Sequence, residues 1–127
     1  MITRLTQRAD FVAANKAAYQ ARPGVVIQAR LRADDVEGEI RVGFTATKKI
    51  GNAVIRNRCK RRLREAAQAL LPSLGRNGYD YVLIARAETP TRDWQALLDD
   101  VKAALIRLAR PERPNTKTSP PQEKTLR

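Results

Sequence analysis

The sequence predicts one small α+β domain, a mixed β-sheet packed with helices, followed by a short tail. Apolar residues recur with helical spacing in three segments and alternate as in strands in three others, in the order helix, two strands, helix, strand, helix. With 127 residues, the chain can bury one modest core. After Arg110 come four prolines and almost no large apolar residue. We therefore expect a domain over residues 1–110 and a disordered, basic, proline-rich tail over residues 111–127.

The N-terminal half predicts one helix and two strands. Residues 6–20 are alanine-rich without Gly or Pro, which predicts a helix that Thr6 caps and that Pro23 and Gly24 end. Residues 25–32 and 40–47 alternate between apolar and polar side chains, as strands do. Because an acidic turn joins them, we expect these two strands to form an antiparallel hairpin.

The C-terminal half predicts a long helix, a strand and a second long helix. Asn52 is a good N-cap for a helix over residues 53–71, which Pro72 should end. Residues 79–86 are apolar on both faces, as expected of a central strand. A loop over residues 87–93, with an N-cap at Thr91, leads to a helix whose apolar stripe begins at Trp94.

The net charge of +12 and the pI near 10.9 indicate a polyanionic partner. Nucleic acid is the first candidate and an anionic membrane surface the second. No apolar run approaches the roughly 18 residues of a membrane-spanning helix. The N-terminus lacks an apolar signal segment, and the single cysteine, Cys59, cannot form a disulfide within the chain. We therefore expect a cytoplasmic protein without a membrane partner.

Positive charge concentrates in residues 48–64, which hold eight basic residues and no acidic one. At helical spacing, Ile55, Cys59 and Leu63 share one apolar face, and the basic side chains occupy roughly two thirds of the circumference. Such a run can be a solvated face that only keeps the protein soluble. A face of a single sign, rich in arginine, instead favours binding to phosphates, since arginine contacts them with two hydrogen bonds. Phe11 and Tyr19 are the aromatic residues available to stack on bases.

No catalytic residue or metal ligand is predicted on the protein itself. The chain has no histidine, and Cys59 lies on the apolar helix face without a base to activate it. The acidic cluster Asp34, Asp35, Glu37 and Glu39 has the composition of a metal site, but a solvated loop explains it better. Asp99 and Asp100 are adjacent on a helix, so their carboxylates should diverge.

Residues 42–65, VGFTATKKIGNAVIRNRCKRRLRE, strongly resemble the signature of the bacterial ribonuclease P protein subunit. The segments RLTQRADFVAA and YDYVLIAR resemble its first helix and a later strand, so that the likeness covers about residues 4–109. Thr47 replaces the usual serine. Asn15 stands where many members have a second aromatic residue in the first helix, and Gln28 stands where some have a tyrosine in the second strand. Both differences bear on how much base stacking this chain supplies.

The resemblance implies the order α-β-β-β-α-β-α, with an extra strand near residues 19–22 and a left-handed βαβ crossover through the basic helix. It implies a catalytic RNA that holds Mg²⁺, with no small-molecule substrate; ribonuclease P RNA and precursor tRNA would be the partners. The residues it places against the catalytic RNA are Lys48, Lys49, Asn52, Arg56, Asn57, Arg58, Lys60, Arg61 and Arg64. Those it places against the 5′ leader of precursor tRNA are Phe11, Gln28 and Arg30. The alternatives are a ribosomal protein or RNA chaperone of related fold and, less well supported, a DNA-binding architectural protein.

Overall fold

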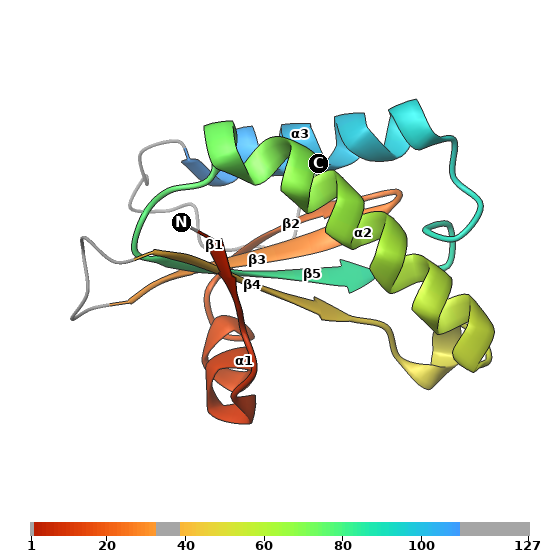
Figure 1. Cartoon of the computed structure of the whole chain (residues 1–127), viewed down its shortest axis with the longest axis horizontal. Coiled ribbons are helices and arrows are strands. Elements are labelled where there is room, and N and C mark those ends of the chain that lie inside the picture. Colours follow the sequence, from red (N-terminus) through yellow and green to blue (C-terminus); the bar gives the residue numbers. More distant parts are fainter. Residues whose placement is uncertain (1, 33–38, 110–127) are drawn as a thin grey trace.

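The structure, a computed structural model, describes residues 2–32 and 39–109 as one mixed sheet with three α-helices (Figure 1). The five strands are β1 (Ile2–Arg4), β2 (Ala18–Arg22), β3 (Val25–Leu31), β4 (Ile40–Thr45) and β5 (Tyr79–Ala85). The helices are α1 (Arg8–Ala14), α2 (Ala53–Leu74) and α3 (Trp94–Ala109), and a 3₁₀ turn, η1 (Lys48–Ile50), precedes α2. The predicted α+β class is confirmed. The tail predicted over residues 111–127 lies outside the described residues.

The strand order is β1-β4-β5-β3-β2, with β5 in the centre, as its two apolar faces predicted. β5 pairs with β4 in parallel and with β3 in antiparallel orientation. The predicted hairpin of β3 with β4 is therefore wrong: β5 lies between them. Alternation shows which face of a strand is buried but not which strand lies beside it. The connection from β4 through α2 to β5 is the left-handed crossover that the resemblance implied (Figure 1).

The helix predicted over residues 6–20 is wrong beyond Ala14. α1 has only seven residues, and Gln7, without a side-chain cap, stands at the N-cap position predicted for Thr6. The chain then forms β2, which pairs with β3 from Ala18 opposite Ala29 onward. Pairing with a neighbouring strand overrides the weak helical preference of this segment. The extra strand implied near residues 19–22 is confirmed as β2, whereas β1 was not predicted.

The ends of the two long helices differ from the predicted ones. Asn52 caps α2 as expected, since its Oδ1 accepts a hydrogen bond from the Ile55 amide at 3.0 Å. α2 continues through Pro72 to Leu74. Pro72 lacks the amide hydrogen that would bond to the Gln68 carbonyl, so the last turn loses one hydrogen bond, but the helix does not end there. α3 begins at Trp94 and is capped by Asp93, not Thr91: the Asp93 carboxylate accepts a hydrogen bond from the Ala96 amide at 3.1 Å.

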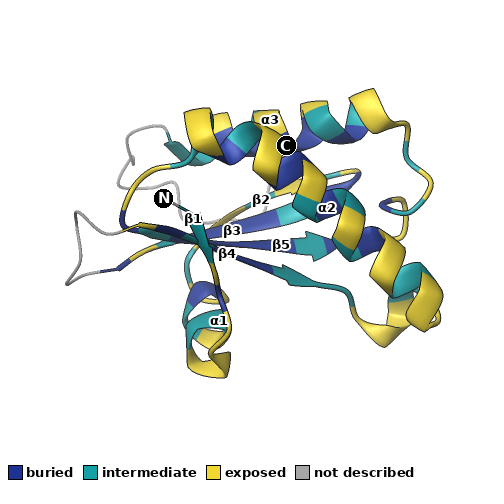
Figure 2. Cartoon of the chain, viewed as in Figure 1, coloured by how far each residue is buried: buried dark blue, intermediate teal, exposed yellow. Residues whose placement is uncertain are grey.

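Helices lie on both faces of the sheet (Figures 1 and 2). α2 and α3 cover one face and enclose the main core, which includes Ile27, Leu63 and Leu83. The short α1 lies on the opposite face above a small cluster of Leu5, Ala14 and Val82. Across the part of the chain described, no helix is both long and apolar enough to cross a membrane.

Candidate nucleic-acid interface

The orientation of α2 agrees with the predicted one. Cys59, Leu63 and Ala66 are fully buried against the sheet. Burial raises the pKa of the Cys59 thiol, although the charge of Arg62 opposes the rise, so the thiol is a core group. Among the predicted RNA-binding residues, six are exposed: Lys48, Lys49, Asn52, Asn57, Arg58 and Arg61. Arg56, Lys60 and Arg64, which form a row along one flank of α2, are partly buried.

The outward basic side chains have no acidic partners among the described residues. Arg58, Lys60 and Arg61 take part in none of the ion pairs there, which all involve other cations. Glu65 is the only acidic residue within α2. Their mutual repulsion is therefore not relieved within the described fold. The outer side of α2 is exposed along most of its length (Figure 2).

Two arginines on the flanks of α2 attach the helix to the rest of the fold. The Arg64 guanidinium lies 5.6 Å from the centre of the Phe44 ring on β4. Arg62 lies 5.7 Å from the centre of the Trp94 ring and donates hydrogen bonds to the carbonyl oxygens of Thr89 and Arg92. In the sequence Arg62 is one of the eight basic residues of 48–64, and local spacing could not show that it joins α2 to the loop before α3.

The three residues predicted to contact the leader all lie on the sheet face that carries α1, and each already has a contact within the protein. Phe11 packs so closely on the sheet that a Cβ at Gly43 would lie 2.6 Å from its ring. Gln28 is buried and donates a hydrogen bond to Asn15 at 3.0 Å. Arg30 is paired with carboxylates. Tyr19, on the edge strand β2, is 54% exposed.

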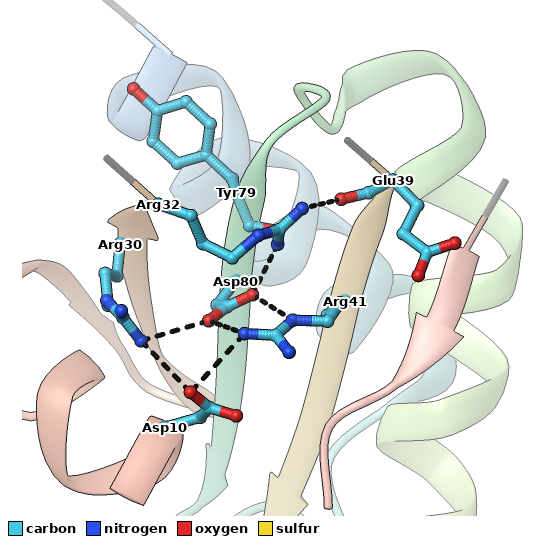
Figure 3. Close-up of polar contacts among 7 residues, drawn as sticks. All are labelled: Asp10, Arg30, Arg32, Glu39, Arg41, Tyr79 and Asp80. Carbon is cyan, nitrogen blue, oxygen red and sulfur yellow. Dashed lines mark hydrogen bonds and ion pairs between the residues drawn. The ribbon is translucent and has the colours of Figure 1, made fainter. Parts of the chain in front are cut away.

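A buried charge network lies on this same face (Figure 3). Asp80 on β5 is fully buried and accepts hydrogen bonds from Arg32 at 2.6 Å and from Arg41 at 2.8 Å. Arg30 lies 3.3 Å from Asp80, and Asp10 of α1 lies 3.4 Å from both Arg30 and Arg41. Arg30 and Arg41 are partly exposed, so positive charge of this network reaches the surface beside α1.

Electrostatics keep the Asp80 carboxylate ionised. Burial acts to raise the pKa of Asp80, but the hydrogen bonds from Arg41 and Arg32, together with their charges, outweigh it and lower the pKa below its usual value. The hydrogen bond to Asp80 correspondingly raises the pKa of Arg41. Sequence reasoning missed this network. The available signal was one aspartate within an otherwise apolar central strand, because a buried charge requires partners.

The described residues include no group of three or more His, Cys, Asp or Glu side chains that could hold a metal ion. Within the predicted acidic cluster, Asp34, Asp35 and Glu37 lie outside the described residues. Asp99 and Asp100 diverge as predicted. Asp100 is buried and accepts hydrogen bonds from the Gly24 amide and from Arg92, whereas Asp99 is exposed and bonds to Gln95.

Fold and surface together define a small α+β protein that presents one strongly basic helix to solvent. A family model described as Ribonuclease P matches residues 2–109. The ribonuclease P protein component of Caulobacter vibrioides is 60% identical over 106 residues, covering 84% of this chain and 70% of that protein. Its counterpart in Ruegeria pomeroyi is 52% identical over 113 residues, covering 87% and 90%. The Staphylococcus aureus RNase P protein superposes with a TM-score of 0.70 at 25% identity, covering 84% of this chain and 94% of that one.

The chain therefore belongs to the bacterial ribonuclease P protein family. It is a protein subunit of ribonuclease P, a ribonucleoprotein that acts in tRNA processing. This membership favours the ribonuclease P role over the ribosomal-protein, RNA-chaperone and DNA-binding alternatives.

Proposed function

We propose that the chain binds ribonuclease P RNA through the outer side of α2 and thereby supports Mg²⁺-dependent maturation of the 5′ end of precursor tRNA. The observation that carries this proposal is the absence of acidic partners for Arg58, Lys60 and Arg61 within the described fold. Each phosphate that such a side chain contacts releases a condensed counterion, which drives association at moderate salt.

The surroundings of the N-terminus of α2 strengthen the positive potential of this surface. Lys48 and Lys49 are exposed in η1 immediately before the helix. The first turn of α2 holds no acidic residue, and the helix dipole places partial positive charge at the same end. Together these features favour phosphate groups at the β4–α2 connection as well as along the helix.

We place the catalytic centre on the RNA, with Mg²⁺ held mainly by RNA phosphates. The chain contains no histidine, its cysteine is buried, and the Asp80 carboxylate is already bonded to arginines. The protein then acts by binding RNA. Its own contribution to the metal ions would be indirect, since neutralising repulsion between phosphates lets the RNA fold closely enough to hold them. Maturation of tRNA by this route would take place in the cytoplasm.

We assign the face that carries α1 to the 5′ leader of precursor tRNA. It presents Phe11, Gln28 and Arg30 beside the partly exposed arginines of the Asp80 network. Because Phe11 and Gln28 are engaged in packing and hydrogen bonding, their main effect would be to shape this surface. Arg30 and Arg41, each partly exposed, supply its charge.

The test compares two charge removals of equal size. Arg58→Ala combined with Arg61→Ala removes two charges from α2, and Lys102→Ala combined with Arg107→Ala removes two exposed charges from α3. Binding to ribonuclease P RNA is measured over a range of salt concentrations. The α2 variant should flatten the slope of log K against log[salt] by roughly 1.4 to 1.8, at about 0.7 to 0.9 per phosphate contact. The α3 variant should leave the slope unchanged. Equal losses in both would show that binding follows net charge and not the α2 surface.

A further inference from the structure

An open cleft of about 630 Å³ lies between α2 and the segment that leads into α3. Its α2 side is lined by Arg58, Arg61 and Arg62, and its other side by Pro90, Arg92 and Trp94. The cleft thus joins the basic surface of α2 to Trp94, an aromatic residue that lies 32 positions after Arg62 in the chain.

The loop that forms one wall of this cleft is held in place by hydrogen bonds of the buried Thr89. The Thr89 hydroxyl donates to the Gly24 carbonyl at 2.7 Å and accepts from the Arg86 amide at 2.7 Å. Arg62 then ties this loop to α2 through the Thr89 carbonyl. A cleft with walls fixed in this way loses little conformational freedom when a ligand binds.

The four arginines of the cleft divide into two groups. Arg92 is occupied by Asp100 and Glu88, and Arg62 by the loop carbonyls and the Trp94 ring. Arg58 and Arg61 have no ion pair within the described fold and remain able to bind phosphate. Glu65 also lines the cleft, but the arginines outnumber it, so the lining favours an anionic ligand.

Trp94 is 38% exposed although tryptophan is among the most apolar side chains. Its ring already interacts with the Arg62 guanidinium, and the exposed part of the indole borders the cleft. Any of the four nucleobases can stack on an exposed indole, because every base has a π-face. An aromatic ring beside two free arginines therefore matches the base and the phosphates of one nucleotide.

We propose that this cleft is a nucleotide subsite, in which an unpaired base of the RNA partner stacks on Trp94 while Arg58 and Arg61 bind the flanking phosphates. The subsite rests on the proposed binding of ribonuclease P RNA by α2 and adds a specific contact to it. It gives the basic helix a preference for RNA with an unpaired nucleotide at this position over a continuous duplex.

The single tryptophan of the chain makes this contact observable, because all tryptophan emission comes from Trp94. Ribonuclease P RNA is titrated into the full chain, and emission and acrylamide quenching are recorded. Stacking should lower the emission and protect the indole from acrylamide, with the same midpoint as binding measured by filter retention. Unchanged emission and unchanged acrylamide access on saturation with RNA would overturn the subsite.

Affinity measurements provide the second test. Trp94→Leu should weaken binding by about 5- to 150-fold, which corresponds to the loss of one stacked base, and Trp94→Phe should recover much of it. Gln95→Ala, an exposed neighbour that does not line the cleft, is the matched control and should bind as the unaltered chain does. If Trp94→Leu binds as tightly as the control, the subsite is wrong while RNA binding by α2 stands. If the unaltered chain does not bind the RNA, the proposed function itself fails. Should Trp94→Leu not fold, the emission experiment decides.

Discussion

Replacing Asp80 with asparagine tests whether the buried charge network holds the sheet together. The change keeps the side-chain volume but removes the negative charge of Asp80 from its hydrogen bonds with Arg32 and Arg41. Removing one partner of a buried ion pair costs about 3–5 kcal/mol. We expect the lower end, about 3 kcal/mol, because Arg30 and Arg41 are partly exposed and Asn still accepts one hydrogen bond. For a domain of this size, that loss lowers Tm by roughly 10–20 °C.

The assay is thermal and urea unfolding of Asp80→Asn beside Asp99→Asn, a control that removes an exposed aspartate from α3. Asp99→Asn should unfold close to the unaltered chain. If Asp80→Asn lowers the free energy of unfolding by less than about 1 kcal/mol, the reasoning is refuted, because an exposed ion pair contributes no more than that.

The pH dependence of this difference has a definite sign. The pKa of Asp80 is lower in the folded chain than its usual value. Its contribution is therefore fully present above the unfolded pKa of about 4 and is lost as the pH falls through the folded pKa. The difference in unfolding free energy between the unaltered chain and Asp80→Asn should stay constant above about pH 5 and narrow on further acidification. A difference that widens in acid would contradict the assignment.

Three further predictions follow from the face that carries α1 and from the tail. Phe11→Ala should destabilise the fold by about 2 kcal/mol, less than the 3–5 kcal/mol that a fully buried Phe costs. It should also weaken binding of precursor tRNA to the assembled enzyme and leave binding of mature tRNA unchanged. Equal effects on both tRNAs would remove Phe11 from the leader surface. Gly43→Ala should cost about 1–3 kcal/mol by displacing the Phe11 ring, and unfolding that matches the unaltered chain would contradict this contact. Deleting residues 111–127 should leave the melting temperature unchanged and RNA affinity nearly so, and a truncated chain that fails to fold would show that the domain extends further.

Local patterns predicted the central parts of the fold well. The spacing of Ile55, Cys59 and Leu63 gave the orientation of α2, and with it the side on which the basic residues lie. The two apolar faces of residues 79–86 gave the central place of β5. In both cases the information is contained within one element, because burial follows the period of the helix or the strand.

Features that depend on contacts between distant segments could not be predicted. The three residues of β1 carry no periodic signal, and β1 exists because it pairs with β4. The position of β5 between β3 and β4 likewise depends on pairing across the chain. At the candidate site, the role of Arg62 is set by the loop before α3, and that of Asp80 by Arg32 and Arg41, which lie far away in sequence.

Cleavage of precursor tRNA by a reconstituted enzyme tests whether this chain acts as a ribonuclease P subunit. The purified chain is added to a bacterial ribonuclease P RNA at a low Mg²⁺ concentration at which the RNA alone is nearly inactive, and formation of mature 5′ ends is followed. We predict that the chain restores cleavage at the mature 5′ end and that the Arg58→Ala, Arg61→Ala double variant does so only at higher protein concentration. Cleavage that stays at the level of the RNA alone, with a folded chain at saturating concentration, would contradict the proposed function.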